Sequence, residues 1–129
     1  MQEKIAKLQS VRILFVEDET DLVAIISDTL NKLKANFETA ENGQIALDKF
    51  KADDTFDLIV TDINMPIMNG LELIKNVREL NKDIPVIIMS AHTEPEYIKS
   101  AEELGVDNYL LKPFDFIKFI NIISTLEFK

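Results

Sequence analysis

Polar and charged residues follow four apolar runs of strand length in this chain. They are Glu17 and Asp18 after the first run, and Asp62, Ser90 and Lys112 after later ones. In a parallel sheet the carboxyl ends of the strands meet at one edge, which is where open α/β sheets bind their ligands. We therefore expect these acids, a hydroxyl and an ammonium group to converge on one site.

The three carboxylates of this group need a counter-charge. Two carboxylates about 5 Å apart repel each other by roughly 3 kcal/mol at an effective dielectric constant of about 20. Oxygen ligands without histidine or cysteine suit a hard cation such as Mg²⁺, which commonly combines one or two carboxylates with a phosphate. Lys112 adds a positive charge that can pair with Asp62 or with a phosphoryl oxygen. This combination indicates phosphoryl transfer to a carboxylate nucleophile.

The segments that must position these residues alternate between strand and helix patterns. The apolar runs that predict strands occupy residues 12–17, 37–40, 56–61, 85–90 and 108–111. Between them, apolar residues recur at helical spacing. The alternation predicts an α/β fold in which a strand-helix unit is repeated five times. Continuous apolar runs such as 13–16, 58–60 and 86–89 are typical of central strands, and the alternating run at 37–40 is expected at an edge.

Turn residues mark where the helices begin and end. Asn42-Gly43 and Asn69-Gly70 are expected to open the second and third helices, and Glu94-Pro95 the fourth. Gly105 is expected to end the fourth helix, because glycine adopts the left-handed conformation that terminates many helices.

Residues 11–129 are expected to form one domain, which fits a chain of 129 residues. Residues 1–10 form an N-terminal extension before the first strand. This extension is either a fraying terminus, which we favour because chain ends are usually poorly ordered, or the end of an upstream helix. The chain ends at Lys129, where the last helix is expected to finish, so we expect no output domain within it.

The helix predicted at residues 116–127 is unusually apolar. Its core stripe contains Phe116, Ile120 and Ile123, and the apolar residues beside this stripe are Ile117, Phe119 and Ile122. One helix cannot bury both sets against a single sheet. We therefore expect part of the second set to form an exposed patch for a partner or a second copy.

Composition excludes several classes of function. The chain has 23 acidic and 14 basic residues and a net charge of -9, which disfavours direct binding to nucleic acid. It has no cysteine, which excludes disulfides and fits a cytoplasmic location. No apolar stretch approaches the ~20 residues needed to span a membrane, and the N-terminus has no apolar segment typical of a secretory signal.

Taken together, the motifs resemble the receiver domain of bacterial two-component response regulators, with a likeness to the chemotaxis regulators. The resemblance covers residues 11–127. The motifs that carry it are Glu17-Asp18, Asp62-Ile63-Asn64-Met65-Pro66 with Gly70, Ser90-Ala91, and Tyr109 three residues before Lys112-Pro113-Phe114.

The resemblance implies a doubly wound, flavodoxin-like fold with five parallel strands in the order 2-1-3-4-5 and helices on both faces. It implies that Asp62 is the phosphoacceptor. Asp18, Asp62 and the backbone carbonyl of Asn64 would hold Mg²⁺, for which Mn²⁺ can substitute, and Glu17 would bind the ion through water.

Further roles follow from the same resemblance. Ser90 and Lys112 would contact the phosphoryl oxygens, and Tyr109 would rotate inward as Ser90 moves. Asn64 and His92 would tune dephosphorylation, and the Lys112-Pro113 bond would be cis. Glu17 stands where aspartate is more frequent in the family, and Ser90 where threonine is often found.

A receiver would take its phosphoryl group from a phosphohistidine on a sensor histidine kinase or a phosphotransfer protein. It would not be an enzyme with a separate substrate, although self-phosphorylation from small donors and autodephosphorylation are expected. Its output would be a change in the face formed by the fourth and fifth helices and the fifth strand, within residues 91–128. This face would bind a target protein or a second copy. The chain could be a stand-alone regulator or part of a longer one.

Two alternative functions stay open. An aspartate-nucleophile phosphatase of the haloacid-dehalogenase type needs a second aspartate two residues after the first, and Asn64 occupies that position. A degenerate receiver that acts only as an interaction module would be expected to lack the acceptor, the acidic pair or the lysine. A phosphate-binding glycine loop is excluded because the three glycines are far apart, and a zinc site rich in histidine is excluded because His92 is the single histidine.

Overall fold

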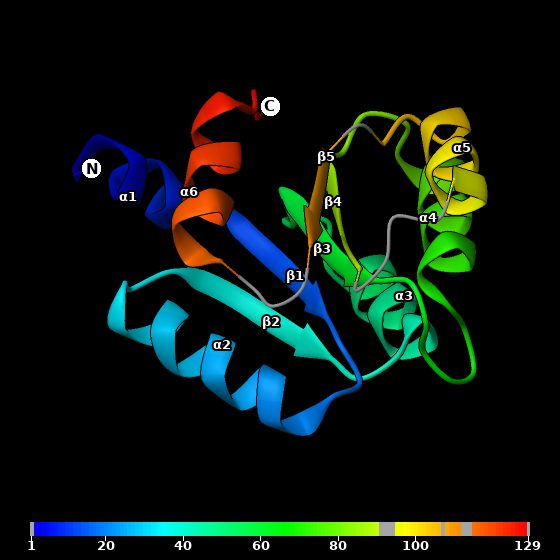
Figure 1. Cartoon of the computed structure of the whole chain (residues 1–129), viewed down its shortest axis with the longest axis horizontal. Coiled ribbons are helices and arrows are strands. Elements are labelled where there is room, and N and C mark those ends of the chain that lie inside the picture. The colour runs from blue at the N-terminus through cyan, green and yellow to red at the C-terminus, as the bar shows by residue number, and fades with distance from the viewer. Residues whose placement is uncertain (1, 91–94, 107, 112–114, 129) are drawn as a thin grey trace.

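The computed structural model describes residues 2–90, 95–106, 108–111 and 115–128. Within these residues, five parallel strands form one sheet in the order β2-β1-β3-β4-β5 (Figure 1). The strands are β1 Arg12–Val16, β2 Asn36–Ala40, β3 Leu58–Asp62, β4 Val86–Ser90 and β5 Asn108–Leu111. The helices are α1 Gln2–Ser10, α2 Thr20–Lys32, α3 Gly43–Ala52, α4 Gly70–Leu80, α5 Pro95–Glu103 and α6 Phe116–Thr125.

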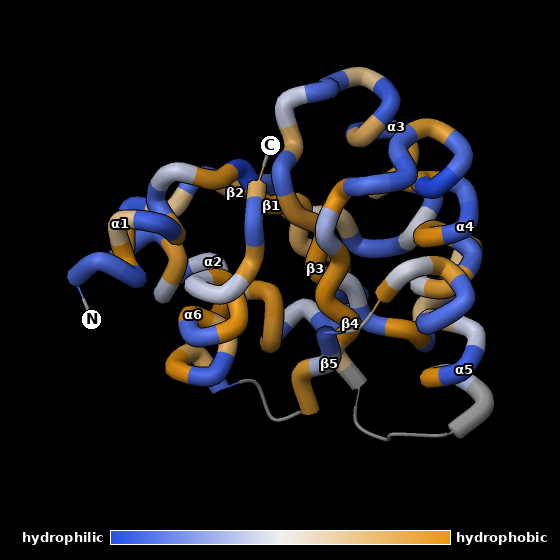
Figure 2. The backbone as a smooth tube through the Cα atoms, turned by 90° about the horizontal axis from the view of Figure 1, so that it is seen from above, coloured by the Kyte–Doolittle hydropathy of each residue, from blue (hydrophilic) through white to orange (hydrophobic). Residues whose placement is uncertain are grey.

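Helices cover both faces of the sheet. α3, α4 and α5 share one hydrophobic core with the sheet, and α1, α2 and α6 share the other (Figure 1). The most hydrophobic parts of the chain lie along the central strands and in α6 (Figure 2). The structure confirms the predicted α/β class, the strand order and the edge position of β2. It also confirms the central strands, since every residue of β3 is buried.

The predicted helix boundaries are confirmed where polar residues cap them. The Asn42 side chain accepts a hydrogen bond from the Ile45 N–H at the start of α3. Asn69 and Glu72 form a reciprocal capping box at the start of α4. Gly105 adopts a φ of 80° after α5, and the Val106 N–H donates to the Ala101 carbonyl, which closes a Schellman motif.

The loop after α5 is also tied to α4. Arg78 donates from Nε to the Leu104 carbonyl and from Nη1 to the Ile84 carbonyl, both at 2.7 Å. Partial burial lowers the pKa of Arg78 from its ordinary value, and Asp83 partly offsets this effect. One side chain therefore links the end of α4, the start of β4 and the end of α5.

Residues 2–10 do not form the fraying extension that we favoured from the sequence. They form α1, whose Leu8 is fully buried in the core shared with α6. Lys4 Nζ donates to Asn121 Oδ1 at 2.7 Å, and Lys7 Nζ donates to the Ser124 and Leu126 carbonyls at the end of α6. Chain ends are usually poorly ordered because they bury little, but Leu8 gives this segment an apolar anchor.

The packing of α1 also decides which apolar residues of α6 stay exposed. Phe119, one of the three residues from which we expected an exposed patch, has no exposed surface and lies in the same core as Leu8. The expectation assumed that α6 packs only against the sheet, whereas α1 covers a second side of it. Ile122 is half-buried, and Ile117 is exposed over 61% of its surface. The expectation that part of this set is exposed is therefore confirmed for Ile117, whereas Phe119 belongs to the core.

Replacement of Leu8 by alanine tests whether α1 is part of the folded domain. Because Leu8 is fully buried, Leu8→Ala should lower the free energy of unfolding by about 3 kcal/mol. Urea unfolding followed by circular dichroism measures this change. Gln2→Ala, at an exposed position of the same helix, is the control and should change the free energy by less than about 0.5 kcal/mol. Equal, small effects of both substitutions would show that α1 adds nothing to stability.

Candidate functional site

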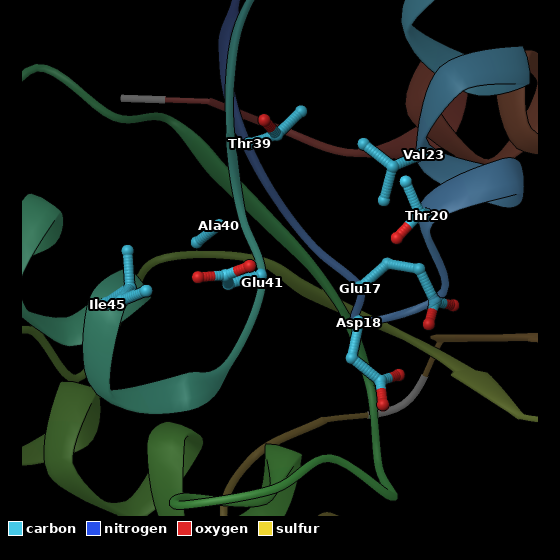
Figure 3. A pocket seen from close by; sticks show the side chains of 8 residues that line it. All are labelled: Glu17, Asp18, Thr20, Val23, Thr39, Ala40, Glu41 and Ile45. Atoms are coloured by element: carbon cyan, nitrogen blue, oxygen red, sulfur yellow. The ribbon is translucent and has the colours of Figure 1, made fainter.

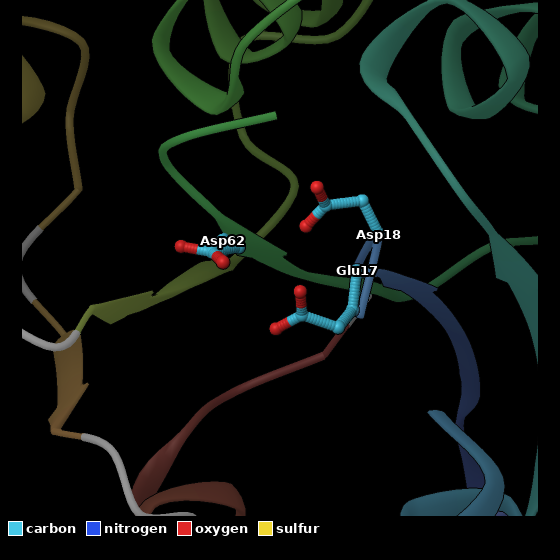
Figure 4. A group of neighbouring side chains, drawn as sticks. All are labelled: Glu17, Asp18 and Asp62. Atoms are coloured by element: carbon cyan, nitrogen blue, oxygen red, sulfur yellow. The ribbon is translucent and has the colours of Figure 1, made fainter. Parts of the chain in front are cut away.

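Three carboxylates gather at the carboxyl edge of the sheet. Glu17 and Asp18 directly follow β1, and Asp62 is the last residue of β3, the strand beside it. One carboxylate oxygen from each residue lies within 4.8 Å of the others (Figure 4). The predicted convergence of these acids is therefore seen in the structure, and it follows from the parallel pairing of β1 and β3.

Glu17 and Asp18 are adjacent in sequence but differ in exposure. Glu17 is 1% exposed, and its Oε2 accepts a hydrogen bond from the Glu19 N–H at 3.1 Å. Its own N–H donates to the Ala40 carbonyl, which extends the pairing with β2 by one residue. Asp18 is exposed. A hydrated cation can therefore approach Asp18 from solvent, while Glu17 is held behind it.

Asp62 is nearly buried, with 8% of its surface exposed. Its Oδ1 accepts a hydrogen bond from the Ile63 N–H at 2.7 Å. The Thr61 hydroxyl donates to the Asp62 backbone carbonyl at 2.8 Å. The side chain and the backbone of Asp62 are thus both held in place. Sequence reasoning did not identify Thr61, although a hydroxyl inside an apolar strand is the signal that could have done so.

The turn after Asp62 is tied to two helices. The Gly70 N–H at the start of α4 donates to the Ile63 carbonyl, and the Gly43 N–H at the start of α3 donates to the Met68 carbonyl. Between these ties, the Met68 N–H donates to the Pro66 carbonyl across Ile67, whose φ is 69°. A β-branched residue rarely adopts a positive φ, and such strain costs on the order of 1–3 kcal/mol.

A cleft opens beside the carboxylates, between α2 and α3 (Figure 3). Glu17, Asp18 and Thr20 line it on the side of α2, and Glu41 and Ile45 line it on the side of α3. Asp18 and Glu41 are exposed. The cleft gives solvent access to Asp18 from the side of β2.

The remaining predicted residues are placed only in part. Ser90 is the last residue of β4 and pairs in register with Leu111 of β5, so its backbone lies at the same edge as Asp62. Asn64 is exposed in the turn after Asp62. Lys112, His92 and the predicted cis bond between Lys112 and Pro113 lie outside the described residues.

Tyr109 is half-buried on β5. Its hydroxyl donates to the Ile98 carbonyl in α5 at 3.3 Å and to the Val106 carbonyl at 3.2 Å. In this structure the side chain is therefore connected to α5, the helix that precedes its strand.

The donor set of the site fits a hard divalent cation. The group formed by Glu17, Asp18 and Asp62 offers only carboxylate oxygens, which suit Mg²⁺ better than zinc or copper. A nearly buried carboxylate beside such an ion can act as a nucleophile toward phosphorus. Among the described residues, no helix has the length and apolar character needed to cross a membrane.

Comparison with protein families gives a match over most of the chain. Residues 13–124 match the family described as the response regulator receiver domain. The chain is 38% identical over 109 residues to the chemotaxis protein CheY-3 of Vibrio cholerae, covering 82% of this chain and 83% of that protein. It is 34% identical over 113 residues to the two-component response regulator ARR10 of Arabidopsis thaliana, covering 87% of this chain but only 20% of that protein.

Solved structures agree with the family match. The response regulator TrrA of Thermotoga maritima, in complex with Mg²⁺ and BeF, has a TM-score of 0.78 and 32% identity, covering 91% of this chain and 99% of that one. The receiver domain of Ssk1 of Saccharomyces cerevisiae, solved with the histidine phosphotransfer protein Ypd1, gives a TM-score of 0.80 and 25% identity over 88% of this chain and 86% of the chain matched.

Proposed function

Because the chain belongs to the response regulator receiver domain family, we propose that Asp62 is its phosphoacceptor and that a partner phosphohistidine is its donor. Receivers of this family act in two-component signal transduction and are generally not enzymes with a separate substrate. The observation that carries the proposal is the position of Asp62 at the end of β3, within reach of two further carboxylates.

The transfer follows from the chemistry of these groups. An Asp62 carboxylate oxygen attacks phosphorus, the bond from phosphorus to the donor's imidazole nitrogen breaks, and the imidazole leaves. The bond from the Ile63 N–H to Asp62 Oδ1 limits rotation of the carboxylate and so orients it for this attack. A bound Mg²⁺ supplies positive charge that neutralises the phosphoryl oxygens.

We propose which residues would hold the metal ion. Asp18 and Asp62 would hold it with the Asn64 carbonyl, and Glu17 would bind it through water. Support comes from the exposure of Asp18 and from the hydrogen bond that already engages the buried Glu17 carboxylate. Mn²⁺ can replace Mg²⁺ because it accepts the same oxygen ligands.

Other residues complete the proposed site. Lys112 and Ser90 contact the phosphoryl oxygens, and Asn64 and His92 tune autodephosphorylation. The supporting observations are the backbone position of Ser90 at the end of β4 and the exposure of Asn64 beside Asp62. Asn64 also argues against a phosphatase with an aspartate nucleophile, because an amide cannot donate and regain the proton that such an enzyme moves.

The proposed donor is a sensor histidine kinase or a phosphotransfer protein in the cytoplasm. Support comes from the similarity to the Ssk1 receiver, which was solved with a histidine phosphotransfer protein. The net charge of -9 argues against direct binding to nucleic acid.

The proposed output face consists of α5, β5 and α6. Tyr109 connects β5 to α5, so a change in its rotamer would release its hydrogen bonds to the Ile98 carbonyl in α5 and to the Val106 carbonyl in the following loop. Leu111 and Ile117 add exposed apolar surface on β5 and α6, at 47% and 61% exposure. We propose that phosphorylation reshapes this face and that a second copy binds there.

Replacement of Asp62 tests the acceptor. Incubation with acetyl phosphate and Mg²⁺ should add one phosphoryl group to the wild-type chain, as measured by intact mass. Asp62→Asn should remain unmodified because an amide is not a nucleophile toward phosphorus. Asp57→Asn is the control. Asp57 directly precedes β3, at the amino ends of the strands, so this variant should be phosphorylated normally. An adduct that persists in Asp62→Asn would disprove the assignment.

Metal dependence separates the two neighbouring acids. Phosphorylation should stop when EDTA removes divalent ions, and either Mg²⁺ or Mn²⁺ should restore it. Asp18→Ala should slow phosphorylation roughly 10-fold more than Glu17→Ala does, because we propose that Asp18 coordinates the ion directly. Calorimetric titration with Mg²⁺ should give the same ranking of affinity. A larger loss for Glu17→Ala would reverse the assignment of the two ligands.

Self-association tests the output face. Sedimentation velocity should show a larger species when Mg²⁺ and beryllofluoride, a mimic of the aspartyl phosphate, are added. Ile117→Lys should prevent this change, because a charge on an apolar contact is costly to bury. Ile25→Lys is the matched control, since Ile25 on α2 is 62% exposed. If the chain stays monomeric in both states, a different target protein is the occupant or the face does not switch, and amide exchange across 95–106 and 116–128 separates these outcomes.

A further inference from the structure

Thr61 places a hydroxyl in an apolar layer of the sheet. It has no exposed surface, and its register partners on β1 and β4 are Val16 and Ile88. Valine has nearly the same volume and would fill this position without burying a polar atom. A buried hydroxyl is costly unless it is hydrogen-bonded. The bond from Thr61 Oγ1 to the Asp62 carbonyl, at 2.8 Å, meets this requirement.

That bond acts on the peptide unit that also orients the Asp62 carboxylate. The Asp62 carbonyl and the Ile63 N–H belong to one planar group, so they turn together. The Ile63 N–H donates to Asp62 Oδ1 at 2.7 Å, and Thr61 holds the carbonyl at the opposite end of the same group. Rotation of this peptide unit would break both hydrogen bonds.

Gly70 leaves the space that this peptide orientation needs. A Cβ atom at position 70 would lie 2.1 Å from the Asp62 carbonyl oxygen, which is far inside van der Waals contact. The Gly70 N–H also donates to the Ile63 carbonyl at 2.8 Å, so the next peptide unit is fixed as well. The Asp62 carbonyl therefore sits between a hydroxyl that holds it and a glycine that makes room for it.

We propose that Thr61 is a positioning residue for phosphoryl transfer: its hydroxyl fixes the peptide between Asp62 and Ile63 and thereby the direction of the Asp62 carboxylate. The inference rests on the proposed function of Asp62, because a carboxylate needs this positioning only if it reacts. Without the hydroxyl, the peptide unit gains rotational freedom and the carboxylate spends less time in the orientation for attack.

Two substitutions separate the hydroxyl from the shape of the side chain. Thr61→Val keeps the volume and removes the hydroxyl, whereas Thr61→Ser keeps the hydroxyl. Thr61→Val should lower the rate of phosphorylation by acetyl phosphate and Mg²⁺ roughly 5- to 10-fold, and Thr61→Ser should stay within about 2-fold of the wild type. Thr29→Val is the control. It removes a hydroxyl that donates to the Ile25 carbonyl within α2, away from Asp62 in the sequence, and it should have no effect on the rate.

An NMR measurement tests the same inference without phosphorylation. The Ile63 amide proton should move upfield and exchange faster in Thr61→Val than in the wild type and in Thr61→Ser, because its bond to Asp62 Oδ1 is weakened. A merely structural role for Thr61 would change the midpoint of urea unfolding but not this single amide.

The inference is overturned if Thr61→Val leaves the Ile63 amide unchanged, or if Thr61→Ser loses as much rate as Thr61→Val. These results differ from a failure of the proposed function. If the wild-type chain takes no phosphoryl group at all, the function of Asp62 is wrong. If the wild type and Thr61→Val react equally fast, Asp62 keeps its function and only the role of Thr61 fails.

Discussion

Electrostatic repulsion among Glu17, Asp18 and Asp62 is the constraint around which this fold is arranged. One oxygen of each lies within 4.8 Å of the others, and nothing in their own chemistry favours that closeness. The packing of β1 and β3 supplies the opposing free energy, since both strands are almost entirely buried between two layers of helices. The domain thus uses the stability of its interior to keep negative charges together, and a bound divalent cation would weaken their repulsion.

Much of the fold could be predicted because its signals are local. Strand runs, caps such as Asn42 and Asn69, and the helix end at Gly105 are set by a few neighbouring residues; the caps and the helix end appear where expected, and the strands begin and end within two residues of the predicted bounds. The docking of α1 could not be predicted in this way. It depends on contact between Leu8 and residues of α6 more than a hundred positions away, and no local pattern encodes that choice.

The residues of the candidate site also differ in how well the sequence predicts them. The three carboxylates were predictable because parallel strands bring their carboxyl ends together. Thr61 was missed although its hydroxyl inside an apolar strand is a signal, because a β-branched residue within a strand is ordinary and its acceptor, the Asp62 carbonyl, becomes visible only in three dimensions. The sequence could not decide which apolar residue of α6 is buried for a related reason, since Phe119 packs in the core that contains Leu8.

The backbone conformation at Ile67 affects which mutations this domain can tolerate during evolution. Its φ of 69° is one that glycine adopts freely, and its side chain is 80% exposed, so the isoleucine gains little burial in return. The sequence therefore keeps an unfavourable residue in the turn that follows Asp62, while its strands are buried. A single substitution that removes the strain at this surface position would raise the free energy of unfolding by about 1 kcal/mol. That gain would let the domain tolerate destabilising mutations elsewhere.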